Sequence, residues 1–124
     1  MTSKNSSKEK SVGVVGMGSF GTAIANILAE KSKVIAYVRR AEVVDEINQK
    51  HTVDGEAINP EILGTQDPEY LCQSCNTIFF MVPSSAFQEV IRSFSPFLYP
   101  YHLIIHGTNG LCLNLPQGKT LEDM

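Results

Sequence analysis

A short apolar run followed by three closely spaced glycines constrains this chain more than any other feature of its sequence. The run spans Val12 to Val15, and the glycines follow with the spacing G-x-G-x-x-G at Gly16, Gly18 and Gly21. An apolar stripe with the spacing of one helix face comes next, at Phe20, Ala23, Ile24, Ile27 and Leu28. The sequence therefore predicts a strand, a tight glycine turn and a helix, in that order.

Each of the three glycines has a distinct physical reason to stand in such a turn. Gly16 lets the chain turn sharply off the strand. Gly18 leaves room for a pyrophosphate to approach the backbone, and Gly21 lets the helix pack close to the strand. The helix N-terminus near Ser19 would present free N–H groups and the positive end of its dipole to phosphates. This context predicts a dinucleotide-binding turn; the alternative, a glycine-rich turn that binds nothing, would not need the second glycine.

The bulk composition places the chain among ordinary globular domains. The chain has 124 residues, of which 43% are hydrophobic. Residues 11–124 are therefore expected to form one domain with a substantial hydrophobic core. A net charge of −3 does not favour binding to nucleic acid. No apolar run reaches the length of a membrane span. Residues 1–10 carry lysines without an apolar segment, which predicts a flexible, solvated tail rather than a signal peptide.

Cysteine usage bears on compartment and on metal binding. Three cysteines, an odd number, are more typical of a reducing compartment such as the cytoplasm than of a disulfide scaffold. Cys72-x-x-Cys75 has no second pair beside it and precedes an expected strand, so we interpret it as a buried thiol pair. The three histidines show no metal spacing, and His102 and His106 are expected to be hydrogen-bonded structural residues. We therefore expect no metal site.

Strands and helices are expected to alternate along the rest of the chain. The expected strands cover 34–38, 77–82 and 102–106, with a short one near 62–66. The expected helices cover 41–49, 68–73 and a stretch after Pro83. Asp67 is the expected N-cap of the second of these helices, and Ser84 or Ser85 that of the third. The remainder of 51–67 is expected to be irregular.

This alternation predicts an α/β fold with a doubly wound, mainly parallel sheet. Ligands bind beyond the carboxyl ends of the strands in such sheets. The candidate binding loops are Gly16 to Gly21, Arg39-Arg40, Val82 to Ser85, and 107–110. No carboxylate directly follows the expected second strand, where an acid would accept the ribose hydroxyls of NAD, and two arginines stand there instead.

Together these segments resemble the N-terminal domain of bacterial-type NAD(P)-dependent glycerol-3-phosphate dehydrogenase. The matching stretches are GMGSFGTAIANILAE at 16–30, VRR at 38–40, EINQKH at 46–51, FFMVPSSAFQEVI at 79–91 and LIIHGTNG at 103–110. The resemblance covers nearly the whole chain after the first ten residues. It implies a Rossmann-type fold, truncated before the C-terminal helical substrate domain. It also implies NADP or NAD as cofactor and reduction of dihydroxyacetone phosphate to sn-glycerol 3-phosphate, a phospholipid precursor.

The resemblance further implies which residues contact the cofactor. Ser19 and Phe20 match positions that touch it beside the glycines. Arg39 and Arg40 match positions that meet the adenosine ribose or its phosphate, and Pro83 lies in the segment that matches the loop near the nicotinamide. The predicted cofactor-binding residues are therefore Gly16, Gly18, Ser19, Phe20, Gly21, Arg39, Arg40 and Pro83.

Two departures from the family pattern bear on catalysis. Asn109 stands where the family has a lysine, and the family's catalytic lysine belongs to the helical substrate domain. We therefore expect no catalytic residue, and no enzymatic turnover by these 124 residues alone. A small phosphorylated substrate would bind only with the second domain. The alternatives are a non-catalytic dinucleotide-binding remnant and the N-terminal domain of another two-domain dehydrogenase, of the 6-phosphogluconate or ketopantoate type. The sequence leaves the oligomeric state open.

Overall fold

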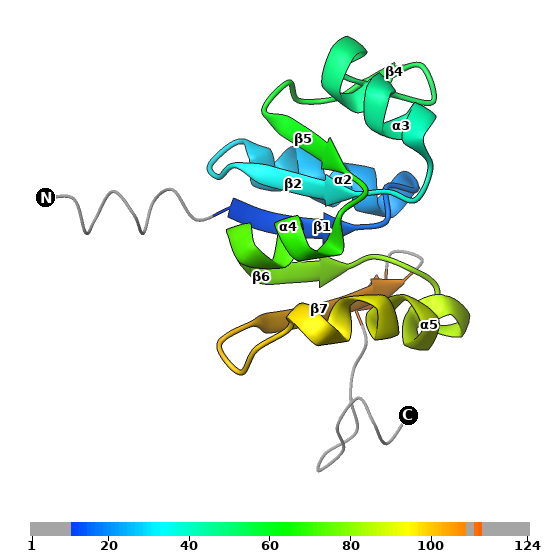
Figure 1. Ribbon diagram of the computed structural model, residues 1–124. Coiled ribbons are helices and arrows are strands. Elements are labelled where there is room, and N and C mark those ends of the chain that lie inside the picture. Colours follow the sequence, from blue (N-terminus) through cyan, green and yellow to red (C-terminus); the bar gives the residue numbers. More distant parts are fainter. Residues whose placement is uncertain (1–10, 109–110, 113–124) are drawn as a thin grey trace, which may run out of the picture.

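A six-stranded sheet forms the centre of the computed structural model, which describes residues 11–108 and 111–112 (Figure 1). The strands are β1 (Ser11–Val15), β2 (Val34–Tyr37), β5 (Ile62–Thr65), β6 (Cys75–Phe80), β7 (Leu103–Thr108) and β8 (Leu111–Cys112). Their order is β5-β2-β1-β6-β7-β8; the first five run parallel and β8 is antiparallel to β7. This order is that of doubly wound nucleotide-binding sheets, so the predicted fold class is confirmed.

The helices cover both faces of the sheet. They are α2 (Ser19–Ala29), α3 (Ala41–Asp45), the π-helix η1 (Glu46–Lys50), α4 (Pro68–Ser74), α5 (Ser84–Phe94) and the short 3₁₀ helix η2 (Ser95–Phe97). In Figure 1, α2 lies behind the sheet, and α4 and α5 lie in front of it. A separate antiparallel hairpin, β3 (Thr52–Val53) with β4 (Glu56–Ala57), lies beside α3 at one end of the molecule. The tail at 1–10, Asn109 and the residues from 113 lie outside the described residues.

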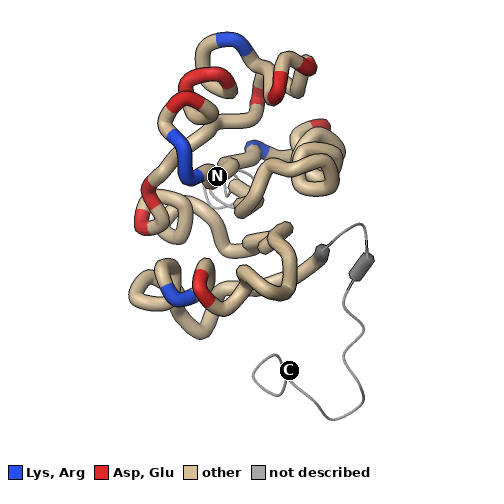
Figure 2. Tube along the Cα trace, turned by 90° about the vertical axis from the view of Figure 1, so that its right-hand side faces the viewer, with Lys and Arg blue, Asp and Glu red and all other residues tan. Residues whose placement is uncertain are grey.

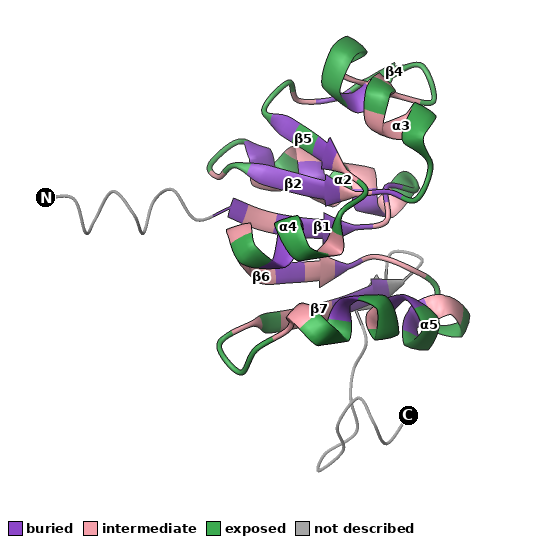
Figure 3. Cartoon of the chain, viewed as in Figure 1, coloured by how far each residue is buried: buried purple, intermediate pink, exposed green. Residues whose placement is uncertain are grey.

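Side chains that alternate along the strands pack into two hydrophobic cores, one on each face of the sheet. Val14 belongs to the core under α2 and η1, and its neighbour Val15 belongs to the core under α4 and α5. Figure 3 shows this buried layer following the strands. In the front core the fully buried ring of Phe80 meets Phe87 and Phe94 edge to face, with centroids 5.8 and 5.2 Å apart. Burying one such side chain stabilises the fold by about 1.5–3 kcal/mol.

The residues of the first helix that are buried against the sheet are small, and Leu28 of the predicted apolar stripe packs partly buried against the same core. The buried positions of this helix are Gly21, Ala25 and Ala29, whereas Ile27 is 63% exposed. A Cβ on Gly21 would collide with the carbonyl oxygen of Gly16. The helix therefore lies so close to the glycine turn that small side chains form the closest contact, and Ile27 is left facing away from the sheet.

Several local predictions can be compared directly with the structure. The Asp67 cap of α4 is confirmed, because its Oδ1 accepts a hydrogen bond from the N–H of Glu69 at 3.0 Å. The predicted cap by Ser84 or Ser85 is wrong, since Pro83 occupies the N-cap position of α5 and no side chain caps that helix. The backbone of Pro83 is extended and the helix begins at the next residue, so Pro83 takes the N-cap position. Ser84 is therefore the first residue of the helix and not its cap.

Strand ends also differ from the expected ones. β6 begins and ends two residues before the predicted strand, and β7 continues through Gly107, which we expected in a loop. The reason for the latter is pairing, because Gly107 and Thr108 form a ladder with β8. Within the predicted irregular stretch, the structure adds the β3–β4 hairpin. Among the described residues, no helix is both long and apolar enough to span a membrane.

Candidate functional site

The carboxyl ends of β1, β2 and β6 meet at the glycine turn. The N–H of Gly16 donates to the carbonyl of Tyr37 at the end of β2, over 3.1 Å. The N–H of Met81, just after β6, donates to the carbonyl of Val15 at 2.8 Å. Here the strand order reverses, since β1 has β2 on one side and β6 on the other. Doubly wound sheets bind ligands outside such a switch point.

The three glycines of the turn differ in what the fold demands of them. Gly16 has φ = +98°, and a Cβ there would lie 2.6 Å from the carbonyl oxygen of Met81. Gly21 cannot take a side chain because of its contact with Gly16. Gly18 has an ordinary φ of −73°, and a Cβ built on it meets nothing within 4 Å. The fold thus requires the first and third glycines, whereas the second faces open space.

The N-terminus of α2 opens onto the same space. Gly18 is its N-cap, and no side chain caps the helix. The first turn, which the structure describes completely, holds no acidic residue. The N–H groups of this turn and the positive end of the helix dipole are therefore available to an anion.

A cavity of about 240 Å³ joins three of the sequence-predicted segments. Gly16, Arg39 and Pro83 all line it, and its walls are mostly apolar. Its lining residues are Val15, Gly16, Met17, Tyr37, Val38, Arg39, Val82, Pro83, Ala86 and Val90. The structure therefore brings Pro83 together with Arg39, although the resemblance assigns these two residues to opposite ends of the cofactor.

Two further cavities of similar size border the same turn. One, of about 270 Å³, is lined by Gly18, Ser19 and Thr22 among others, and the second, of about 230 Å³, by Arg39 and Arg40 among others. Both are also lined by Met17, Val53 and Asp54. Of the predicted cofactor residues, Phe20 and Gly21 line none of the three cavities.

Sequence reasoning missed the contribution of the β3–β4 hairpin to this site. The two-residue turn Asp54-Gly55, with φ of +53° and +79°, connects the strands. Such Asp-Gly dipeptides favour tight hairpin turns, so the dipeptide was a usable signal. What the sequence could not indicate was where the hairpin would lie, namely against the glycine turn and the two arginines.

Glu46, the first residue of η1, is hydrogen-bonded to this hairpin. Its Oε2 accepts a hydrogen bond from the hydroxyl of Thr52 at 2.7 Å and from the N–H of Gly55 at 3.0 Å. The hydrogen bond from Gly55, and after it the one from Thr52, lower the pKa of the Glu46 carboxyl below its ordinary value. The ionised carboxylate therefore holds both ends of the turn region in place.

Acidic residues lie near the two arginines of the site. Arg40 lies 3.6 Å from Glu42, with both side chains more than 70% exposed, so this pair adds little stability. The backbone carbonyl of Arg39 accepts a hydrogen bond from the side chain of Gln66 at 2.8 Å, which fixes the end of β2. Figure 2 shows acidic residues gathered at the end of the molecule that carries α3, η1 and the hairpin.

The loop after β6 is held by His106. Its Nε2 lies 3.2 Å from the carbonyl oxygen of Val82, and its ring stacks on Phe87 with centroids 4.0 Å apart. His102 bonds the carbonyl of Cys72 through Nε2 at 2.9 Å and accepts from the N–H of Tyr99 at 2.8 Å. Both histidines are thus hydrogen-bonded structural residues, as predicted.

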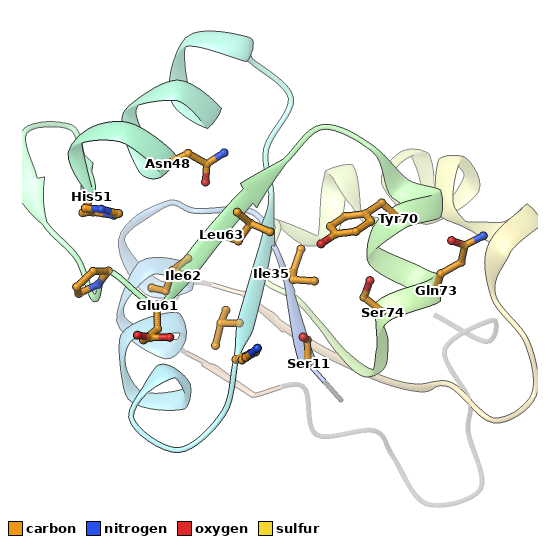
Figure 4. A pocket seen from close by; sticks show the side chains of 13 residues that line it. Ser11, Ile35, Asn48, His51, Glu61, Ile62, Leu63, Tyr70, Gln73 and Ser74 are labelled. Atoms are coloured by element: carbon orange, nitrogen blue, oxygen red, sulfur yellow. The ribbon is translucent and has the colours of Figure 1, made fainter. Parts of the chain in front are cut away.

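A larger cavity, of about 710 Å³, is remote from this site (Figure 4). Ser11, Lys33 and Ile62 line it, which places it at the amino ends of β1, β2 and β5. In Figure 4, Leu63 and Tyr70 lie on one side of β5 and His51 on the other. Since ligands of doubly wound sheets bind at the opposite edge, its size alone does not make it the candidate site.

The cysteine pair is buried, as predicted. Cys72 on α4 and Cys75 at the start of β6 are 2% and 0% exposed. Burial raises the pKa of the Cys72 thiol to about 11, so it is an unreactive thiol at neutral pH. Across the described part of the chain, no group of three or more His, Cys, Asp or Glu residues is arranged to hold a metal ion.

Comparisons with known proteins agree with this architecture. The family model described as the N-terminus of NAD-dependent glycerol-3-phosphate dehydrogenase matches residues 11–124. A glycerol-3-phosphate dehydrogenase (NAD(P)+) from Enterococcus faecalis is 35% identical over 108 residues, which cover 83% of this chain and 32% of that protein. The corresponding protein from Carboxydothermus hydrogenoformans is 31% identical over 105 residues, covering 81% of this chain and 31% of that one.

A solved structure gives the same result for the fold. The crystal structure of glycerol-3-phosphate dehydrogenase from Coxiella burnetii superposes with a TM-score of 0.70 at 28% identity, over 84% of this chain and 34% of that one. The chain thus spans about a third of the length of the relatives it matches.

Proposed function

Because the chain belongs to the family of NAD-dependent glycerol-3-phosphate dehydrogenase N-terminal domains, we propose that it forms the NADP- or NAD-binding part of such an oxidoreductase. The reaction proposed for the whole protein is reduction of dihydroxyacetone phosphate to sn-glycerol 3-phosphate. The bound dinucleotide would supply the hydride. Binding of the phosphorylated substrate is proposed only for this domain together with a substrate domain like that of its relatives.

The observation that carries this proposal is the open space in front of Gly18. A glycine that the fold does not require, next to two that it does, is explained if a ligand must approach that backbone. Phosphates fit there because the uncapped N-terminus of α2 offers free N–H groups and a positive dipole end. We propose that Ser19 and the first turn of α2 bind the pyrophosphate.

The cavity shared by Arg39 and Pro83 supports placing the adenosine end of the dinucleotide over β2. We propose that the apolar walls of this cavity, with Val82 and Val90, accept the adenine ring. Arg39 and Arg40 would lie at the ribose, where a guanidinium can pair with a 2′-phosphate. Pro83 would then contact the adenosine end. A cytoplasmic location is proposed on the ground that buried thiols persist in a reducing compartment.

The experiment replaces Gly18 by valine and measures cofactor binding. Titration calorimetry with NADPH and NADH should give a loss of about tenfold or more in affinity, because the branched side chain fills the space for the pyrophosphate. Ala23→Val is the matched control, since Ala23 is exposed on the same helix and lines none of the three cavities. Unfolding curves should show both variants folded. Equal affinity of wild type and Gly18→Val would overturn the proposal.

A further inference from the structure

We propose that Asp54 sets the balance between NADP and NAD in this domain, because its carboxylate opposes a 2′-phosphate in the space that Arg39 and Arg40 would otherwise make favourable. This inference rests on the proposed function, since it assigns a specificity-determining residue to the same cofactor site. The three residues line one cavity, although Asp54 comes from the hairpin and the arginines come from the end of β2.

The position of Asp54 is at the junction of the two halves of the site. It lines the cavity with Gly18 and Ser19, where the pyrophosphate is proposed to bind, and also the cavity with Arg39 and Arg40. The adenosine ribose of a dinucleotide lies between its pyrophosphate and its adenine. A group attached to that ribose therefore comes close to both cavities, and Asp54 borders both.

The fold holds Asp54 at this position from two sides. Its own φ of +53° and that of Gly55 at +79° form a tight turn with little freedom to open. The carboxylate of Glu46 accepts hydrogen bonds from Thr52 and from the N–H of Gly55, on either side of Asp54. These contacts oppose a movement of Asp54 away from the cavity when an anion enters.

Charge decides the direction of the effect. A 2′-phosphate carries a charge of about −1.5 to −2 at neutral pH, whereas the 2′-hydroxyl of NAD is neutral. Two guanidinium groups attract that phosphate, and the carboxylate of Asp54 repels it, with Glu46 lining the same cavity. NADH lacks the 2′-phosphate and therefore escapes this repulsion, and its neutral 2′-hydroxyl can donate a hydrogen bond to a carboxylate. Removal of the Asp54 charge should therefore favour NADPH over NADH.

The test is Asp54→Asn, a substitution that removes the charge and keeps the turn. Asparagine tolerates the left-handed backbone of residue 54, and Asn-Gly is also a preferred hairpin dipeptide. The matched control is Glu61→Gln, which removes the same charge from an exposed position that lines only the remote 710 Å³ cavity among those described. NADPH and NADH are titrated by calorimetry into the 124-residue wild type and each variant, at low and at high salt.

For Asp54→Asn we expect the ratio Kd(NADH)/Kd(NADPH) to rise about fivefold at low salt and less at 0.5 M salt, since screening weakens the repulsion. The ratio for Glu61→Gln should stay within about twofold of wild type. An unchanged ratio in Asp54→Asn, or an equal change in both affinities, would overturn the specificity role while leaving the cofactor site intact. Failure of the wild type to bind either dinucleotide would overturn the proposed function and this inference with it.

Discussion

The side-chain amide of Asn48 pairs with both backbone polar groups of Gly64. The N–H of Gly64 donates to Oδ1 at 2.7 Å, and Nδ2 donates to the Gly64 carbonyl at 3.1 Å. Gly64 lies in β5, the strand at one edge of the sheet. The amide of Asn48 thus makes the two hydrogen bonds that a further strand would make there, and η1 closes the edge that would otherwise be open to another chain.

Asn48→Ala is expected to destabilise the domain by about 1–3 kcal/mol, because it leaves the N–H and C=O of Gly64 without their partner. It should also favour self-association through β5. Urea unfolding measures the first effect and sedimentation velocity the second. Gln49→Ala, which changes the exposed neighbour in η1, is the control and should stay near wild type. Equal stability of the two variants would show that the amide pairing contributes nothing.

Replacing Gly21 or Gly18 of the turn by alanine should distinguish the glycine that the fold requires from the one that it does not. Gly21→Ala is expected to cost about 3 kcal/mol or more, since its Cβ collides with the backbone of Gly16. Gly18→Ala should change the free energy of unfolding by less than about 0.5 kcal/mol, because its Cβ meets open space. Chemical unfolding of the two variants in parallel checks this. A large loss of stability in Gly18→Ala would contradict the account of that residue.

Local patterns predicted the elements of this fold well. The apolar run before Gly16 became β1, the Asp67 cap starts α4, and the predicted strand near 62–66 is β5. These features depend on hydrogen bonds and side-chain alternation within a few residues, which a sequence displays directly. The convergence of Gly16, Arg39 and Pro83 followed from the rule that parallel strands place their carboxyl ends at one edge.

Features decided by distant contacts could not be predicted in the same way. The stripe of large apolar residues on α2 satisfied the helix periodicity, yet the close approach to Gly16 selected Gly21, Ala25 and Ala29 for the buried face. Asp54 entered the site because Glu46 holds the hairpin there, and that contact links residues that no short motif joins. The residues that directly follow β2 therefore gave no indication that Asp54 would line a cavity with the two arginines.

The buried thiol of Cys72 should resist alkylation in the folded domain. With its pKa raised to about 11, only about one thiol in a thousand is ionised at pH 8, and it is 2% exposed. Iodoacetamide at pH 8, followed by peptide mass spectrometry, should modify Cys72 about a hundredfold more slowly without urea than in it. Similar rates under the two conditions would mean that α4 opens readily from the sheet.

The hydrogen bonds of Glu46 should make the hairpin sensitive to acid. The pKa of this carboxyl is lowered from its ordinary value of 4.5, so its contribution to stability is complete above that value. That contribution is lost as the pH falls through the lowered pKa of the folded state. The amide shift of Gly55 in NMR spectra should therefore titrate with a midpoint below 4.5.

Two variants complete this test of the hairpin. Glu46→Gln keeps an acceptor oxygen and should abolish the titration of the Gly55 amide with the hairpin still formed. Glu46→Ala removes both hydrogen bonds and should weaken NADH binding, because the wall of the site is loosened. NADPH binding should weaken less, because the carboxylates of Glu46 and Asp54 then oppose the 2′-phosphate less strongly. A titration midpoint at or above 4.5 in the wild type would rule out the stabilised carboxylate.

Removing both arginines at the end of β2 should lower the affinity for NADPH more than that for NADH. A hydrogen bond to a charged group contributes about 1.5–3 kcal/mol, so the double variant Arg39→Ala, Arg40→Ala should reduce the ratio Kd(NADH)/Kd(NADPH) by about tenfold or more. The matched control is Lys31→Ala, Lys33→Ala, which removes two positive charges from exposed positions before β2, at the opposite edge of the sheet. If the control lowered the ratio as much as the arginine variant, the effect would be one of net charge. The salt dependence of NADPH binding should also become shallower only in the arginine variant, since only there is a direct contact with the 2′-phosphate lost.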